Sequence, residues 1–196
     1  MNKVDYNSIM MKELSNFNGK VLLHCCCGPC ATAVVERILP FCSPTLFWYN
    51  PNIMPQAEEE KRKENLQAVA EHFGVEVIDA GYDNEEFTSK IKGLENEREG
   101  GKRCPVCFYI RLYKTALWAK ANGYNYFCST LSVSPHKNAA LINEIGKQIE
   151  KEVGIKWLCN DFKKKEGFKR STALSEQLGL YRQNYCGCTY GKQGEN

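Results

Sequence analysis

The residues in this chain with the most reactive side chains are its cysteines, of which there are eleven among 196 residues. Three groups of them have short spacings, and the groups lie far apart along the chain. The groups are Cys25-Cys26-Cys27-Gly28-Pro29-Cys30, Cys104-Pro105-Val106-Cys107 and Cys186-Gly187-Cys188. Thiolates are nucleophilic, oxidisable and good ligands for soft metals. The sequence therefore predicts a protein that holds a metal centre and does redox chemistry.

Two of these groups contain a Cys-x-x-Cys pair, and each pair stands where a helix is expected to begin. Residues i and i+3 share one face of a helix, and a helix N-terminus stabilises thiolates. Cys27 with Cys30, and Cys104 with Cys107, could therefore bind tetrahedral zinc or an iron–sulfur cluster. The 73 residues between the pairs (31–103) far exceed the roughly 15–20 of a zinc ribbon, which argues against that class of site.

Cys186 and Cys188 are separated by a single glycine. A disulfide across one residue is strained and more easily reduced, which suits a reversible redox pair. The same two thiols could instead bind a metal or have no chemical role. Cys128 and Cys159 end expected strands and are predicted to be small buried hydrophobic residues, and Cys42 has no assigned role.

Composition and hydropathy indicate the class of protein. Hydrophobic residues make up 43% of the chain and charged residues 25%, which is typical of a globular domain rather than of a secreted disulfide scaffold. The first twenty residues contain no apolar signal region, and nothing approaches the roughly 18 consecutive apolar residues of a membrane span. An odd number of cysteines also fits poorly with full pairing. We therefore expect a cytoplasmic protein without a membrane segment.

Short apolar runs alternate with amphipathic or charged segments along the chain. Strands are expected at 20–25, 45–49, 75–79, 124–128 and 155–159. Helices are expected at 30–39, 56–73, 84–97, 104–122, 137–153 and 171–178, and the tail 181–190 is expected to be irregular. There is no repeat, low-complexity tract or linker. We therefore expect one α/β domain over residues 1–196, with a basic, cysteine-containing C-terminal segment from about residue 160.

The alternation predicts an α/β fold that is doubly wound, with a mostly parallel sheet of about five strands. Such folds bind ligands beyond the carboxyl ends of the strands, where the direction of winding reverses. The first expected strand delivers Cys25–Cys27 to this edge, and Cys104 opens the helix that leads into the fourth strand. Both pairs are therefore expected to meet in one crevice. The chain contains neither G-x-G-x-x-G nor a Walker A loop, so the cysteine loop stands where a phosphate loop would lie.

The C-terminal segment is basic and contains several tyrosines. Between Lys156 and Arg182 there are seven Lys/Arg and three Asp/Glu, a local excess of +4. Basic and aromatic side chains suit an RNA loop, whose phosphates meet the charges and whose splayed bases stack. A charge run is also common on a face that is merely solvated. If RNA is the partner, we expect it to contact Lys163–Lys165 and Arg170.

Six blocks of sequence resemble the QueH-type epoxyqueuosine reductases. The blocks are His24-x-Cys26-Cys27-Gly28-Pro29-Cys30, Tyr49-Asn50-Pro51-Asn52-Ile53, Arg103-Cys104-x-x-Cys107, Ser134-Pro135-His136-Lys137, Asp161-Phe162-Lys163-Lys164 and Tyr181-Arg182-Gln183-x-Tyr185-Cys186-Gly187-Cys188. The resemblance implies a nucleotide-α-hydrolase-like (Rossmann-like) fold. It also implies reduction of epoxyqueuosine to queuosine at the wobble position of tRNA, the last step of queuosine biosynthesis. Cys25 is extra to the family pattern, which leaves the register of the three consecutive cysteines open.

The resemblance further implies a cofactor and a set of functional residues. The implied ligands of a [4Fe-4S] cluster are Cys26, Cys27, Cys104 and Cys107. Cys186 and Cys188 are implied as a catalytic redox pair or, with Cys30, as ligands of an additional mononuclear metal. Converting an epoxide to an alkene consumes two electrons and two protons, so the reaction needs an external electron donor and an acid. Asp161 and His136 are the candidates for that acid.

Two functions of other classes remain open from the sequence. An iron–sulfur tRNA thiolation enzyme would use the same fold and cofactor, although such enzymes normally keep an intact nucleotide-binding loop. A non-catalytic, zinc-stabilised RNA-binding module would use the cysteines only for structure, and the brown colour of an iron–sulfur protein would exclude it.

Overall fold

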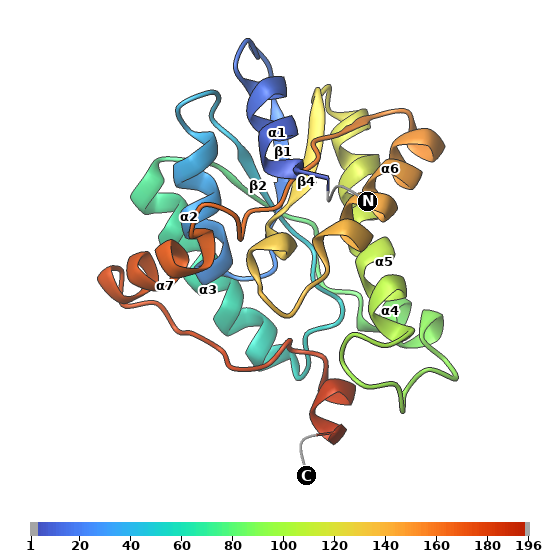
Figure 1. The fold of residues 1–196 in the computed structure, drawn as a ribbon. Helices are drawn as coiled ribbons and strands as arrows, with labels where there is room; N and C mark the ends of the chain where they lie inside the picture. The colour runs from blue at the N-terminus through green and yellow to red at the C-terminus, as the bar shows by residue number, and fades with distance from the viewer. Residues whose placement is uncertain (1–3, 195–196) are drawn as a thin grey trace.

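Five short parallel strands form the centre of the computed structural model, which describes residues 4–194 (Figure 1). The strands are β1 (Val21–His24), β2 (Thr45–Trp48), β3 (Val77–Asp79), β4 (Tyr126–Ser129) and β5 (Lys156–Trp157). They lie in the order β3-β2-β1-β4-β5, and every pairing is parallel. The parallel sheet of about five strands expected from the sequence is therefore confirmed.

Helices cover both faces of this sheet. They are α1 (Tyr6–Leu14), α2 (Gly28–Ile38), α3 (Gln56–Phe73), α4 (Asn84–Lys90), α5 (Arg103–Ala121), α6 (Ala139–Val153) and α7 (Gly167–Gln177), with short 3₁₀ turns η1 (Thr130–Val133) and η2 (Thr189–Gly194). Helices α2, α3 and α7 pack together on one side, whereas α5 and α6 pack together on the other (Figure 1). This is the doubly wound arrangement. Within residues 4–194, no helix is both long enough and apolar enough to cross a bilayer.

The direction of winding reverses between β1 and β4, which are neighbours in the sheet. His24 joins the carboxyl ends of three strands at this point. Its Nδ1 lies 2.8 Å from Ser129 Oγ at the end of β4, and its Nε2 lies 3.3 Å from the carbonyl oxygen of Tyr49, just after β2. Burial lowers the pKa of His24 to about 3, so the imidazole is neutral. The strand ends at the switch point are thus held by one buried side chain.

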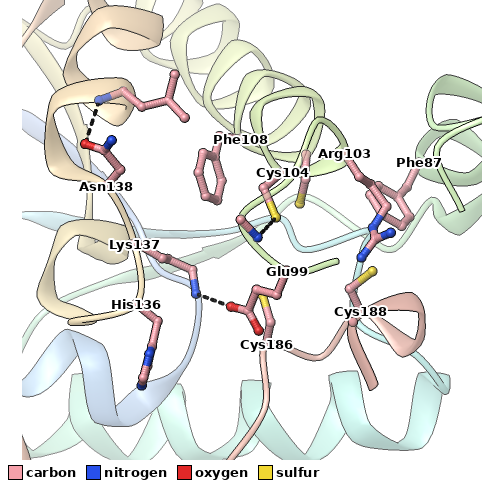
Figure 2. Close-up of a pocket in the computed structure, with 14 residues that line it drawn as sticks. Phe87, Glu99, Arg103, Cys104, Phe108, His136, Lys137, Asn138, Cys186 and Cys188 are labelled. Atoms are coloured by element: carbon pink, nitrogen blue, oxygen red, sulfur yellow. Dashed lines mark hydrogen bonds and ion pairs between the residues drawn. The ribbon is translucent and has the colours of Figure 1, made fainter. Parts of the chain in front are cut away.

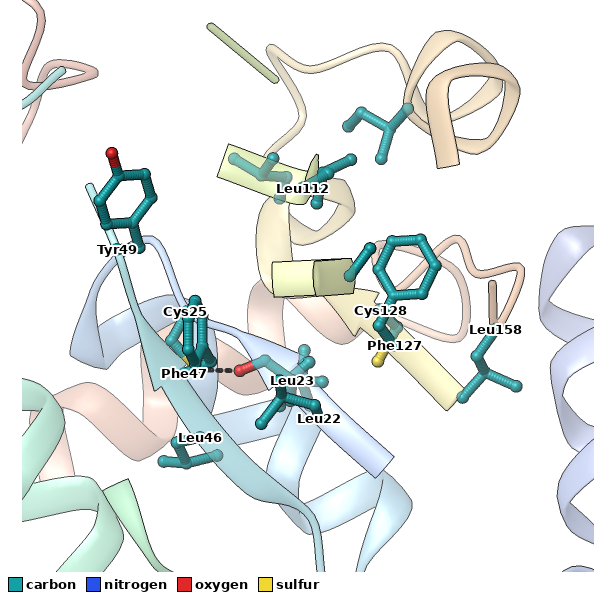
Figure 3. Packing of buried hydrophobic residues seen from close by; sticks show 14 of the residues in the cluster. Leu22, Leu23, Cys25, Leu46, Phe47, Tyr49, Leu112, Phe127, Cys128 and Leu158 are labelled. Carbon is teal, nitrogen blue, oxygen red and sulfur yellow. Dashed lines mark hydrogen bonds between the residues drawn. The ribbon is translucent and has the colours of Figure 1, made fainter. Parts of the chain in front are cut away.

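The hydrophobic core lies on both faces of the central strands (Figure 3). Leu22 and Leu23 of β1 are both fully buried although they point to opposite faces, as expected for a parallel sheet that is covered on each side. Cys25 continues this core, and its thiol donates a hydrogen bond of 3.4 Å to the carbonyl oxygen of Leu23. Cys128 and Cys159 are also buried, as the sequence predicted.

One expected helix is shorter than the sequence indicated. The charged segment 84–97 forms α4 only as far as Lys90, so the prediction for its second half is wrong. Gly93, with φ +86°, lies outside the helical region just after this end, and buried Arg103 then donates 3.0 Å hydrogen bonds to the carbonyl oxygens of Leu94 and Glu95, and also bonds that of Glu97. These carbonyl groups are bound by Arg103 instead of by helical amides. The loop therefore stays irregular and leads into α5.

Candidate metal and redox site

The loop after β1 brings three thiols together at the N-terminus of α2. The Sγ atoms of Cys26, Cys27 and Cys30 all lie within 4.8 Å of one another. The sulfur of Cys27 caps α2 by accepting a hydrogen bond of 3.5 Å from the amide of Cys30. Gly28 is required because a Cβ there would lie 2.5 Å from the carbonyl oxygen of Asn65 on α3. Three thiols this close form a group that could bind a metal.

Four further thiols line a cavity of about 80 Å³, which we call the thiol cavity (Figure 2). They belong to Cys104 and Cys107 in the first turn of α5, and to Cys186 and Cys188 in the C-terminal tail. The rings of Phe87 and Phe108 contribute apolar wall. Burial in this wall raises the pKa of Cys107 to about 12.

A second cavity of about 270 Å³ lies against the thiol cavity, and we call it the α7 cavity. Its wall includes Cys26 and Cys30 from the start of α2, the first turns of α7, and residues 182–186 of the tail. The two cavities share Glu99, His136, Lys137 and Cys186. Cys186 therefore faces both cavities, and all three cysteine groups converge on the crevice at the switch point.

A buried arginine lies between the cysteine groups. The side chain of Arg111 on α5 is 2% exposed, with Nη1 3.8 Å from Cys107 Sγ and Nη2 donating 2.6 Å to Asn50 Oδ1. Its Nε has no hydrogen-bond partner among residues 4–194. Although burial alone would lower the pKa of Arg111, the thiol groups of Cys107 and Cys26 raise it. Sequence reasoning did not find Arg111; its position one helical turn after Cys107 was the available signal.

A second cation, Lys137, faces the same thiols. Its Nζ lies 3.8 Å from Glu99 Oε1 in the wall shared by the cavities (Figure 2). Burial opposes its charge, but Cys186, Cys26 and Glu99 outweigh burial and raise the pKa of Lys137. Correspondingly, hydrogen bonds from the thiols of Cys27 and Cys30, with the charges of Arg111 and Lys137, hold the pKa of Cys26 well below its ordinary value. Negative charge on sulfur is thus favoured at Cys26, whereas burial raises the pKa of Cys104 and Cys107.

Helix α3 holds the tail that carries Cys186 and Cys188. The buried side chain of Arg62 donates from Nη1 to the carbonyl oxygen of Cys186 at 3.1 Å and from Nη2 to that of Tyr185 at 3.4 Å. Gly187 has φ +99°, and a Cβ there would lie 2.8 Å from the Arg62 guanidinium. The glycine therefore permits both the turn and the close approach. Both tail cysteines are free thiols, so the structure contains no Cys186–Cys188 disulfide.

The two candidate acids lie in different surroundings. His136 is exposed and lines both cavities. Asp161 is 8% exposed and its carboxylate accepts a hydrogen bond of 3.2 Å from Lys163, outside the lining of either cavity. Lys163 also donates to the carbonyl oxygen of Lys137 at 3.2 Å. Asp161 is thus linked to the site through the Lys163 side chain.

The basic run expected to meet RNA is divided by the fold. Lys164 and Lys165 are exposed and border a surface hollow beside Asp5 and Asn7, away from both cavities. Arg170 donates hydrogen bonds of 2.8 and 2.5 Å to the carboxylate of Glu36. The structure therefore does not bring these side chains to the cysteine crevice.

A doubly wound parallel sheet with thiols clustered at its switch point is typical of an enzyme whose ligand site uses thiol chemistry. Residues 21–194 match the family described as "Epoxyqueuosine reductase QueH". The chain belongs to this family of oxidoreductases. A non-catalytic RNA-binding module is therefore not the correct class.

Individual curated relatives agree with this assignment. An epoxyqueuosine reductase QueH from Streptococcus pyogenes serotype M1 is 38% identical over 96% of this chain and 78% of its own length. One from Thermotoga maritima is 39% identical over 88% of this chain and 90% of its own length. Another from Staphylococcus epidermidis is 37% identical over 98% of this chain and 87% of its own length.

Proposed function

We propose that this chain reduces epoxyqueuosine to queuosine at the wobble position of tRNA, the last step of queuosine biosynthesis. The observation that carries the proposal is the position of Cys186, which faces both cavities at the point where the three cysteine groups converge. One cavity adjoins the Cys26–Cys30 group and the other adjoins the Cys104–Cys107 pair. Reactive thiols therefore stand beside a space that a modified base could enter.

A [4Fe-4S] cluster is the proposed cofactor, with Cys26, Cys27, Cys104 and Cys107 as its ligands. Thiolate sulfur is the donor that such clusters take, and the buried cation Arg111 contacts Cys107 and influences Cys26. A cluster with four thiolates is an anion, so the unpartnered Nε of Arg111 fits its charge. When bound, the cluster supplies electrons one at a time. As the alternative to a redox pair, Cys186 and Cys188 are proposed, together with Cys30, as ligands of an additional mononuclear metal.

The protein's own residues can supply a complete reduction. Oxidation of the Cys186 and Cys188 thiols to a disulfide releases two electrons and two protons, which is what an epoxide needs to become an alkene and water. An external electron donor then returns the disulfide to two thiols. His136 is the proposed acid at the leaving oxygen, because it lines both cavities. Asp161 would support it by holding Lys163 against the backbone of Lys137.

The proposed partner is the anticodon loop of tRNA, and the proposed compartment is the cytoplasm, where tRNA and cellular reductants are available. The test is complementation of a bacterial strain that lacks epoxyqueuosine reductase. The wild-type chain should convert the epoxyqueuosine in tRNA to queuosine, and the Cys186→Ser variant should not. Accumulation of epoxyqueuosine with both would contradict the proposal, provided that both proteins are present at equal levels. Thiolated nucleosides in the same digest would instead indicate the tRNA thiolation alternative.

A further inference from the structure

The α7 cavity contains more positive than negative side chains. Its charged wall residues are Arg62, Arg111, Lys137, Arg182 and Glu99. Arg62 and Arg111 are buried and bound internally, and Lys137 faces Glu99. Arg182 is exposed, and in the part of the chain that the structure describes it has no carboxylate partner; it donates a hydrogen bond of 3.4 Å to Ser175 Oγ. An exposed guanidinium in this position suits the phosphate of a ligand.

An aromatic ring stands next to this arginine. Phe168, in the first turn of α7, lines the cavity and leaves 42% of its surface exposed. The guanidinium carbon of Arg182 lies 5.9 Å from the centroid of its ring. A large apolar side chain held in water at the rim of a charged cavity is the arrangement on which unpaired bases stack.

The two residues before the start of α7 adopt an unusual backbone conformation. Lys165 and Glu166 both occupy the left-handed region, with φ of +55° and +56°, which non-glycine residues seldom adopt. Gly167 follows, and a Cβ there would collide with the carbonyl oxygen of Phe162. Two strained residues persist only where the surrounding structure over-determines them, and they cluster at ligand sites.

Helix α7 is also fixed to the cysteine loop. Ser171 Oγ donates a hydrogen bond of 2.5 Å to the carbonyl oxygen of Pro29, in the first turn of α2. Phe168, one turn earlier on α7, and Cys30, next to Pro29, therefore belong to one rigid wall of the cavity. Cys26 and Cys186 line the same space. A base stacked on Phe168 would thus share one cavity with the thiols of Cys26 and Cys186.

We propose that Phe168 and Arg182 bind the wobble nucleotide of the RNA, with Phe168 stacking on the base and Arg182 contacting a flanking phosphate. This inference rests on the proposed function, and it replaces Lys163–Lys165 as the primary contact at the reacting nucleotide. To enter the cavity, the base must leave the stack of the anticodon loop, and stacking on the Phe168 ring replaces the contacts that it loses. The guanidinium of Arg182 offsets the negative charge of the flanking phosphate.

The test is a binding cycle with two synthetic anticodon stem-loops, one with guanine at the wobble position and one abasic there. Holoenzyme and its Phe168→Ala variant are titrated with each RNA. The substitution should weaken binding of the guanine RNA by roughly 5- to 100-fold, the range of one base–aromatic stack. It should leave binding of the abasic RNA unchanged, and Phe168→Tyr should restore the guanine preference. Equal losses with both RNAs, or no loss, would overturn the stacking role.

The phosphate contact is tested by the salt dependence of the same binding. Arg182→Gln should reduce the slope of log affinity against log salt by about 0.7, the value for one single-strand phosphate. Lys156→Gln removes the same charge from the amino end of the edge strand β5, outside the lining of both cavities, and should leave the slope unchanged. Equal slopes for Arg182→Gln and wild type would overturn the contact.

Turnover is measured separately, so that failure of this site can be distinguished from failure of the proposed reaction. Base-dependent binding without reduction would contradict the proposed reaction. Reduction without base-dependent binding would contradict this site.

Discussion

Arg62 donates a hydrogen bond of 3.1 Å to the carbonyl oxygen of Cys186, although the two residues are 124 positions apart in the sequence. The same guanidinium pairs with Glu58 at 2.7 Å, so α3 and the tail share one buried cation. The position of Cys186 between the two cavities thus depends on a helix from the other half of the chain. The position of the proposed redox pair thus depends on tertiary structure as much as on the Cys-Gly-Cys sequence.

Replacing this cation should loosen the tail. Arg62→Met removes charged hydrogen bonds to buried carbonyl groups and should lower the free energy of unfolding by about 2 kcal/mol. For a chain of this size, that corresponds to a Tm lower by about 4–8 °C in thermal melts. Cys186 should also be alkylated faster by a maleimide, measured by mass spectrometry. Gln67→Ala, at an exposed position of α3, is the control. An unchanged Tm together with an unchanged alkylation rate would show that Arg62 does not hold the tail.

Gly187 should tolerate no side chain. Gly187→Ala adds a Cβ at φ +99°, 2.8 Å from Arg62 and 3.0 Å from Ile53, so the tail must move. Gly179→Ala is a matched control, since its φ is +59° but no atom lies within 4 Å of the added Cβ. We expect limited proteolysis to cut the tail of Gly187→Ala much faster than that of Gly179→Ala. Equal cutting rates would mean that backbone strain alone, and not contact with α3, governs this position.

Single substitutions can distinguish the cysteines that bind the proposed cluster from those that do not. Cys104→Ser or Cys107→Ser should lose the iron and visible absorbance of anaerobically purified protein, because each removes a proposed cluster ligand. Cys42→Ser, at a half-buried thiol that lines neither cavity, should keep both. Cys30→Ser should keep the cluster and lose at most the additional metal. Loss of the cluster in Cys30→Ser would instead assign the ligands to the close group of Cys26, Cys27 and Cys30.

Cys188 should be needed for turnover but not for the cluster. Its thiol is 7% exposed and lines only the thiol cavity, whereas Cys186 faces both cavities. Cys188→Ser should therefore retain the absorption spectrum and fail to produce queuosine over many turnovers. Normal multiple turnover by this variant would exclude both the dithiol role and an essential second metal at this position.

Lys164 and Lys165 should contact parts of the tRNA outside the anticodon stem-loop. Replacing Lys164 and Lys165 with Gln removes two exposed charges that lie outside both cavities. Binding of whole tRNA should weaken and its salt dependence should flatten, by about 0.7 in slope for each single-strand phosphate engaged. Binding of the isolated anticodon stem-loop should not change. A weaker stem-loop complex would place the loop across these lysines, as the sequence alone suggested.

Much of the fold could be predicted because patterns of neighbouring residues indicate where its helices and strands lie. The apolar spacing and Gly74 stop indicated a helix over 56–73, and α3 has those bounds, with Gly74 at φ +66°. Cys25 is also explained by strand geometry: its amide bonds the carbonyl oxygen of Phe47, so it extends β1 and points to the same face as Leu23. The adjacent Cys26 and Cys27 then leave the strand and join the thiol group.

Long-range contacts account for what the sequence did not show. The irregular loop after α4 is held by Arg103, which bonds the carbonyl groups of Leu94 and Glu95. The buried charge of Arg111 depends on Asn50, 61 positions earlier, as its partner. Neither relationship has a periodicity or a motif that a single sequence reveals. The first helix, α1, was missed for a similar reason, because its buried residues Met10 and Leu14 are anchored by the rest of the core.

The measurement that tests the central claim most directly is a single-turnover reaction of reduced, purified enzyme with tRNA that carries epoxyqueuosine. The nucleosides are released and quantified by mass spectrometry, with Cys186→Ser as the matched control. We predict stoichiometric conversion of epoxyqueuosine to queuosine by the wild-type chain and none by the variant. Persistence of epoxyqueuosine with wild-type enzyme whose cofactor is intact and reduced would contradict the proposed reaction.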